Sequence, residues 1–185
     1  SDNMRTDKPW TILNSEIKYK NPWMQIREDK VITPLGSEGI YGVLESNDSV
    51  MVAVVNDQYN LYMVRTFAYP DQSWNWELPG GGGDLQDPIE ASKRELEEET
   101  GILADTWELL GKTRVCNGFM TEHMAVYLAR DLSFTGKKEV SAEQIDEAKF
   151  FSMKQIDAMI ESGEINDAQS ITGIHLAQKW LERNV

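Results

Sequence analysis

The chain has 185 residues, of which 41% are hydrophobic, so it can build one packed domain with at most a small appendage. Acidic residues outnumber basic ones by 31 to 18, and the net charge of −13 argues against binding DNA or RNA through their phosphates. The single cysteine, Cys116, excludes an intrachain disulfide, and no apolar run reaches the ~18 residues of a membrane-spanning helix, so we expect a cytoplasmic protein.

The first third of the chain is predicted to form short strands. Three of them surround proline and glycine turns, at Trp10–Leu13, Val31–Thr33 and Ile40–Leu44. Two longer apolar runs follow, Ser49–Val55 and Leu61–Phe67. The polar segment between these two runs, residues 56–60, has the composition of a turn, so we expect the runs to pair as a hairpin.

A run of four glycines, residues 80–83, leads into a short acidic helix. Asp87 is a suitable N-cap and Pro88 suits the first helical position. Gly101 is a natural stop, because glycine readily adopts the left-handed conformation that ends helices. The sequence therefore predicts a helix over Pro88–Thr100.

Three glutamates of this helix are predicted to share one face. Glu95, Glu98 and Glu99 have the spacing i, i+3, i+4, and each like-charge pair at such spacing costs a few tenths of a kcal/mol. They also lie in the last turn, where the helix dipole already presents negative charge. A divalent cation would remove both penalties, since hard cations prefer oxygen ligands. A solvated acidic surface is the alternative, and the adjoining glycine run favours the metal site.

The rest of the chain alternates predicted strands and helices. The strands are expected at Trp107–Val115, His123–Ala129 and Lys149–Ser152. Two helices close the chain, Lys154–Glu161 and Ala168–Arg183, the second with Asp167 as its cap. Strands interleaved with single helices predict a mixed sheet between helical layers.

The segment from residue 80 to residue 102 resembles the Nudix box. That family pattern reads Gly, five residues, Glu, seven residues, and then Arg-Glu-apolar-any-Glu-Glu-any-Gly-apolar. Eight of its nine fixed positions are matched, by Gly80, Arg94, Glu95, Leu96, Glu98, Glu99, Gly101 and Ile102. The ninth departs from the pattern, because Gln86 stands where the family has its first glutamate. We expect Gln86 to alter loop packing or metal binding rather than to abolish activity.

Segments outside the box resemble the family branch that hydrolyses ADP-ribose and nucleotide sugars. They are Val64–Pro70, Trp76–Gly80, Asn117–Glu122 and Gly163–Ala168. The resemblance implies an α+β fold, a Nudix-type α/β/α sandwich with a mixed β-sheet and a small N-terminal β-rich segment. Residues 1–45 would form that segment, through which we expect homodimerisation, and residues 46–185 would form the Nudix hydrolase domain.

The resemblance also implies a metal-dependent site that uses magnesium or manganese. The metal ligands would be Glu95, Glu98, Glu99 and the backbone of Gly80, and the three glutamates would also be catalytic. Bound metal would neutralise charge on pyrophosphate oxygens and activate a water molecule. Arg94 is expected to orient a glutamate through a charge-assisted hydrogen bond.

A general base and substrate contacts follow from the same resemblance. In that branch the base is often a glutamate on a loop before the last strand. The candidates are Glu139, Glu143 and Glu147, of which Glu143 has the best loop position, while a merely solvated loop is the alternative for each. The expected substrate-binding residues are Arg65, Glu122 and Glu77.

The sequence thus predicts a hydrolase that cleaves ADP-ribose or a related nucleoside diphosphate sugar into a nucleoside monophosphate and a sugar phosphate. Two alternatives stay open. The domain could hydrolyse dinucleoside polyphosphates, nucleoside triphosphates or coenzyme A, or it could bind a nucleotide without cleaving it. An ATPase-type phosphate loop does not fit, because the glycines are followed by Asp84 rather than by Lys and Ser or Thr.

Overall fold

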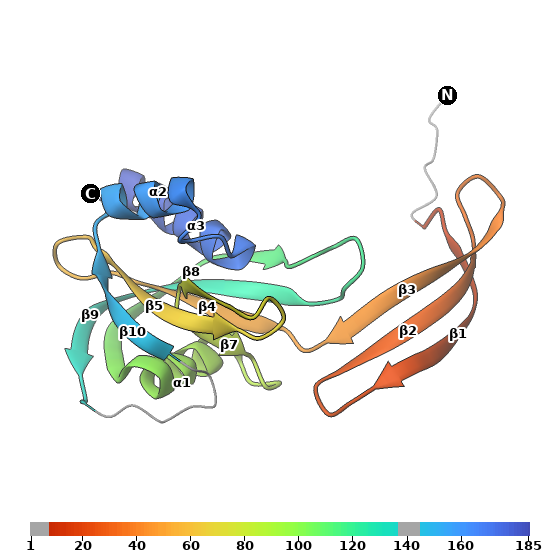
Figure 1. Ribbon diagram of the computed structural model, residues 1–185, viewed down its shortest axis with the longest axis horizontal. Coiled ribbons are helices and arrows are strands. Elements are labelled where there is room, and N and C mark those ends of the chain that lie inside the picture. Colours follow the sequence, from red (N-terminus) through yellow and green to blue (C-terminus); the bar gives the residue numbers. More distant parts are fainter. Residues whose placement is uncertain (1–7, 137–144) are drawn as a thin grey trace. The chain divides into compact units, whose positions relative to one another are not determined.

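The structure, a computed structural model, describes residues 8–136 and 145–185, which form two compact units. The smaller unit consists of Ser1–Asn47 together with Arg114–Glu122. The larger unit consists of Asp48–Thr113 and His123–Val185. The chain therefore leaves the smaller unit once and returns to it for nine residues before completing the larger one (Figure 1).

The smaller unit is built on an antiparallel sheet with the strand order β1-β2-β3. Its strands are β1 (Thr11–Lys20), β2 (Met24–Ile32) and β3 (Glu38–Ser46). They are two to three times longer than the sequence predicted, because polar residues interrupt the apolar runs and leave both ends of each strand without a signal. The returning segment joins β3, where the Leu44 amide donates to the Phe119 carbonyl at 2.7 Å and the Thr121 amide donates to the Leu44 carbonyl at 3.0 Å.

The larger unit contains two sheets and three helices. One sheet has the order β7-β4-β9-β8 and the other the order β10-β5-β6. The strands are β4 (Ser49–Val54), β5 (Leu61–Ala68), β6 (Ser73–Glu77), β7 (Gly80–Gly82), β8 (Ile102–Arg114), β9 (His123–Phe134) and β10 (Ile145–Phe151). The helices are α1 (Pro88–Thr100), α2 (Met153–Ser162) and α3 (Ala168–Asn184). Strands β4 and β9 run parallel while β4 and β7 run antiparallel, so the predicted mixed sheet is confirmed.

The sheets of this unit lie between helical layers, with α1 on one side and α2 and α3 on the other (Figure 1). Strand β4 shows the reason, because side chains of both its faces are buried. Val52 packs in one buried cluster with Leu96 of α1. Met51, on the opposite face, lies beside Gly173 of α3. This arrangement confirms the expected α/β/α sandwich.

The helix ends follow the capping residues that the sequence offers. The Asp87 side chain accepts from the Ile89 amide at 3.2 Å, and Gly101 takes a left-handed φ of 69° at the other end of α1. The Asp167 side chain likewise caps α3 by accepting from the Ser170 amide at 2.9 Å. The predicted bounds of α1 are confirmed. The longest helix, α3, has 17 residues, and no helix in the described ranges is long and apolar enough to cross a membrane.

The predicted hairpin of Ser49–Val55 with Leu61–Phe67 is wrong. A single antiparallel bridge joins Val55 to Leu61, after which β4 and β5 enter different sheets. The turn itself exists, since Asn56 Oδ1 accepts from the amides of Gln58 at 3.1 Å and Asn60 at 2.9 Å. Strand pairing follows burial instead, because β4 is buried on both faces and takes the central position between β7 and β9.

Candidate active site

The glycine run forms the short strand β7 and lies against β4, with Gly80 opposite Met51 and Gly82 opposite Ser49. A Cβ atom at Gly80 would lie 2.5 Å from the Val50 carbonyl oxygen, so only glycine fits there. A Cβ atom at Gly81 would lie 2.6 Å from Cδ of Glu95 and 2.7 Å from its Oε2. The bare backbone of Gly81 therefore leaves the space that the Glu95 carboxylate occupies.

The three glutamates of α1 lie on one face, as predicted, and are buried to different degrees. The Glu95 side chain is 13% exposed and the Glu98 side chain 33%, whereas Glu99 is buried. Glu99 Oε2 accepts from the Gly80 amide at 3.3 Å. Leu96, which follows Glu95 and lies beside the glutamate face of α1, is fully buried in the core and fixes the rotation of the helix. The glutamates are thereby turned toward the glycine run.

Arg94 holds two of these carboxylates together. Its Nη1 atom donates to Glu95 Oε1 at 3.0 Å and to Glu98 Oε2 at 3.2 Å. Burial lowers the pKa of the Arg94 guanidinium, but Glu95, followed by Glu98 and Asp84, raises it more, so that the net shift is upward. Arg94 is therefore always charged here, and its contacts are those of a residue that orients glutamates.

The same guanidinium fixes the loop between β7 and α1. Nη2 of Arg94 donates to the Gly82 carbonyl oxygen at 3.2 Å and forms an ion pair with Asp84 at 3.1 Å, while Nε donates to Gln86 Oε1 at 2.7 Å. Asp84 and Leu85 both have left-handed φ angles, of 47° and 60°. Non-glycine residues in that region cost of order 1 kcal/mol or more each, so Arg94 stabilises a loop that its sequence alone would not favour.

Asp48 is a further organising residue, which sequence analysis missed because the segment around it, residues 46–49, has the composition of an ordinary turn. Its backbone oxygen accepts from the Gly83 amide at 2.8 Å. Its Oδ1 atom accepts from the His123 amide at 2.9 Å. Asp48 therefore ties the end of the glycine run to the first residues of β4 and β9.

The donor set suits a hard divalent cation. Carboxylate and carbonyl oxygens are the ligands such cations prefer, and the missing Cβ of Gly81 lets the Glu95 carboxylate lie directly against the glycine backbone. Within the described residues, no three acidic, histidine or cysteine side chains already converge as metal ligands. The reason is visible in the contacts, since Glu95 and Glu98 are directed toward Arg94 and Glu99 toward the Gly80 amide.

Arg65, a predicted substrate-binding residue, lies on the side of its sheet that faces away from α1. Val64, the preceding residue, packs in the buried cluster with Leu96 of α1, and successive strand residues point to opposite faces. The Arg65 guanidinium pairs with the Asp146 carboxylate and lies 5.0 Å from the centroid of the Trp74 ring.

Glu77 lies on the α1 side of the same sheet. It stands directly opposite Val64 in the pairing of β5 with β6, and directly opposite residues share a face. Its side chain is partly exposed, so it can still meet a ligand there.

The remaining predicted residues lie in different parts of the chain. Glu122 belongs to the smaller unit, where it accepts from the Ser46 hydroxyl at 3.3 Å. Glu147 lies opposite Arg65 in β10 and forms an ion pair with Lys149 at 3.0 Å. Glu139 and Glu143 lie outside the described residues.

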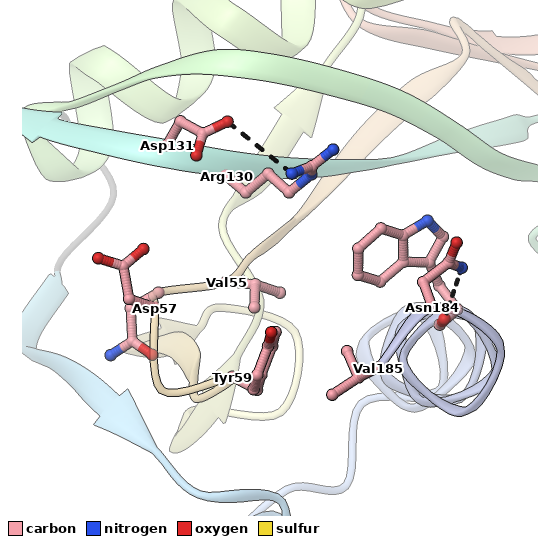
Figure 2. A pocket seen from close by; sticks show the side chains of 9 residues that line it. Val55, Asp57, Tyr59, Arg130, Asp131, Asn184 and Val185 are labelled. Atoms are coloured by element: carbon pink, nitrogen blue, oxygen red, sulfur yellow. Dashed lines mark hydrogen bonds and ion pairs between the residues drawn. The ribbon is translucent and has the colours of Figure 1, made fainter.

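A separate hollow of about 300 Å³ lies in the larger unit, and Figure 2 shows its lining. It is bounded by the turn after β4, by Arg130 and Asp131 of β9, and by the last turn of α3. Arg130 lies 5.6 Å from the centroid of the Trp180 ring, which closes one side. None of the residues that line the hollow is a member of the glycine run or of α1, so it is distinct from the site described above.

Comparison with known protein families defines the class of this protein. The profile of the NUDIX domain matches residues 45–172, and that of the nucleoside diphosphate sugar hydrolase N-terminal domain matches residues 10–44. The chain therefore belongs to the Nudix family, and the predicted family and enzyme class, a pyrophosphohydrolase, are confirmed.

Individual relatives are similar along most of their length. The chain is 29% identical over 165 residues to the ADP-ribose pyrophosphatase of Mycobacterium tuberculosis (strain ATCC 25618 / H37Rv), covering 88% of this chain and 80% of that protein. It is 26% identical over 177 residues to the ADP-ribose pyrophosphatase of Bacillus subtilis (strain 168), covering 95% of both. A crystal structure of an ADP compounds hydrolase superposes with a TM-score of 0.85 at 22% identity, covering 96% of this chain and 97% of that one, and it supports the fold.

Proposed function

We propose that this Nudix hydrolase cleaves the pyrophosphate bond of ADP-ribose or of a related nucleoside diphosphate sugar, releasing a nucleoside monophosphate and a sugar phosphate. The observation that carries the proposal is the match of residues 10–44 to the N-terminal domain of nucleoside diphosphate sugar hydrolases, directly before the NUDIX match over residues 45–172. Relatives named ADP-ribose pyrophosphatase align over nearly the whole chain, which supports the same substrate class.

We place a magnesium or manganese site at Glu95, Glu98, Glu99 and the Gly80 carbonyl. A cation bound there would neutralise the pyrophosphate oxygens and lower the pKa of a coordinated water. The chain itself orients the groups involved. Arg94 donates hydrogen bonds to Glu95 and Glu98, and the Gly80 amide donates one to Glu99.

The remaining roles are assigned from the family resemblance. Glu143 would take the proton of the attacking water. Glu147 is a weaker candidate, because it is paired with Lys149 and stands opposite Arg65, which points away from α1. Substrate contacts are proposed for Arg65, Glu77 and Glu122, and the position of Glu77 on the α1 side of its sheet supports it best.

The test is release of nucleoside monophosphate from a panel of substrates. The panel contains ADP-ribose, GDP-mannose, UDP-glucose, diadenosine polyphosphates and nucleoside triphosphates, each with magnesium, with manganese or with a chelator. Metal-dependent cleavage of a sugar diphosphate, at a rate well above that of the other compounds, is the expected result. Preferential cleavage of triphosphates or diadenosine polyphosphates would overturn the substrate assignment, and nucleotide binding without any cleavage would overturn the proposed hydrolysis.

We also propose that two copies associate through the N-terminal strands. All ten residues of the edge strand β1 are exposed, among them Ile12, Leu13, Ile17 and Tyr19. A three-stranded sheet with so much apolar surface in water needs a covering partner, and a second copy offers a matching edge. Light scattering after size exclusion should give the mass of a dimer, and Leu13→Glu should shift it to that of a monomer. A monomeric wild-type chain would disprove the proposal.

A further inference from the structure

Gln86 is the one position of the Nudix box at which this chain departs from the family pattern, and it makes a defined contact. Its Oε1 atom accepts from Arg94 Nε at 2.7 Å. A glutamate could accept the same hydrogen bond, so this contact alone does not distinguish the two residues. The difference lies in the other half of the side chain, where glutamine carries an NH₂ group and glutamate a second acceptor oxygen.

The contact with Arg94 fixes the orientation of the Gln86 amide. A guanidinium can only donate hydrogen bonds, so the amide oxygen must face Arg94 and the NH₂ group must point away from it. Gln86 is exposed, and in the described part of the chain no acceptor is paired with its Nε2 atom. Two N–H donors are therefore presented to solvent in a fixed direction.

The charges around Gln86 indicate what those donors can bind. The same guanidinium contacts Glu95 and Glu98 through Nη1, so a single planar group separates the amide from two of the proposed metal ligands. Three carboxylates, the third from Asp84, already surround Arg94. A glutamate at position 86 would add a fourth carboxylate with acceptor oxygens only, whereas the glutamine amide adds N–H donors that can bind a phosphate oxygen.

We infer that Gln86 donates a hydrogen bond from its Nε2 atom to a phosphate oxygen of the substrate, so that in this chain it is a substrate-binding residue. The inference rests on the proposed function and extends it, because it assigns a phosphate contact to a position that in the family pattern carries a negative charge. If Gln86 only positioned Arg94, glutamate would serve at least as well, since a charge-assisted hydrogen bond is the stronger one.

Two substitutions separate these roles. Gln86→Glu keeps an acceptor for Arg94 but removes the N–H donors. Gln86→Met removes the acceptor and the donors with a side chain of similar size. Gln58→Glu, in the exposed turn after β4, is the control for an added surface charge. Steady-state hydrolysis of ADP-ribose with magnesium would be compared with calorimetric binding of ADP, each at low and at high ionic strength.

We expect Gln86→Glu to raise the KM for ADP-ribose and the Kd for ADP about tenfold with kcat little changed, as for the loss of one hydrogen bond to a charged group. Gln86→Met should raise KM and also lower kcat, because Arg94 loses its hydrogen-bond partner at Nε and is held less firmly. Three results would overturn the inference. The KM of Gln86→Glu could be unchanged or lower than that of the wild type. Its KM could also rise no more than that of Gln58→Glu, or rise only at low ionic strength. If the wild-type chain hydrolyses no sugar diphosphate, the proposed function fails, but ADP binding by the same variants still decides the role of Gln86.

Discussion

Replacing Gly81 by alanine is expected to disable the site while leaving the fold intact. The new Cβ atom would lie 2.6 Å from Glu95 Cδ, whereas ordinary contacts begin at 3.4 Å, so the carboxylate must retreat by about 1 Å. The φ angle of Gly81 is not in the left-handed region, so the backbone accepts alanine. Because the obstacle is the end of a flexible side chain, Glu95 moves instead of the strand.

The expected loss of kcat/KM is about 100-fold, since displacing a catalytic group by ~1 Å commonly costs that much. Hydrolysis of ADP-ribose measures it, and calorimetric titration with magnesium should show weaker metal binding. The melting temperature should stay close to that of the wild type. Normal turnover together with normal magnesium affinity in Gly81→Ala would refute the placement of Glu95 at the metal.

The neighbouring glycine supplies the matched comparison. Gly80→Ala would bring a Cβ atom within 2.5 Å of the Val50 carbonyl oxygen, which belongs to a central strand and cannot move freely. Overpacking of this kind costs about 1–3 kcal/mol, so this variant should lower the melting temperature clearly. Gly42→Ala, where no atom lies within 4 Å of the added carbon, is the control for the substitution itself.

Three more outcomes are expected. Glu98→Gln should keep the wild-type melting temperature but lower turnover by orders of magnitude, and near-normal activity would contradict its assignment as a metal ligand. Glu143→Gln should slow turnover at neutral pH, and an unchanged rate would move the general base elsewhere. The Asp29 pKa is lowered by the hydrogen bond from the Ser15 hydroxyl at 2.6 Å and by Arg27 at 2.9 Å, despite burial. Its ionised form therefore stabilises the fold above about pH 4. The difference in melting temperature between the wild type and Asp29→Asn should be full at pH 7 and shrink below pH 4. A difference that is independent of pH would disprove this contribution.

The parts of the fold that were predictable depend on local chemistry. Asp87, Pro88 and Gly101 set the ends of α1 through contacts within a few residues, and the i, i+3, i+4 spacing placed the glutamates on one face. The hairpin prediction failed because the pairing of β4 depends on distant residues. Whether β4 pairs with β5 or with β9 is decided by which strand buries both its faces, and the sequence of the turn carries no information on that.

The same distinction explains the site. Because side chains alternate along a strand, the sequence predicts that Val64 and Arg65 point to opposite faces. Which of the two faces meets α1 depends on how the sheets assemble. The contact of Gln86 with Arg94 likewise follows a loop in which Asp84 and Leu85 have left-handed φ angles, and leucine has no preference for that conformation. The family resemblance could name Arg94 as an orienting residue, yet only the path of the loop shows how many groups it joins.

The return of Arg114–Glu122 to the smaller unit has a consequence for how the protein is made. The Ser46 amide and the Thr121 hydroxyl, which contact each other in that unit, are 75 positions apart in the chain. A growing polypeptide exposes β1, β2 and β3 long before it supplies the segment that hydrogen-bonds to Leu44. The unit can therefore be completed only after α1 and all of β8 have been synthesised, and a fragment that ends at Asn47 would lack part of its own structure.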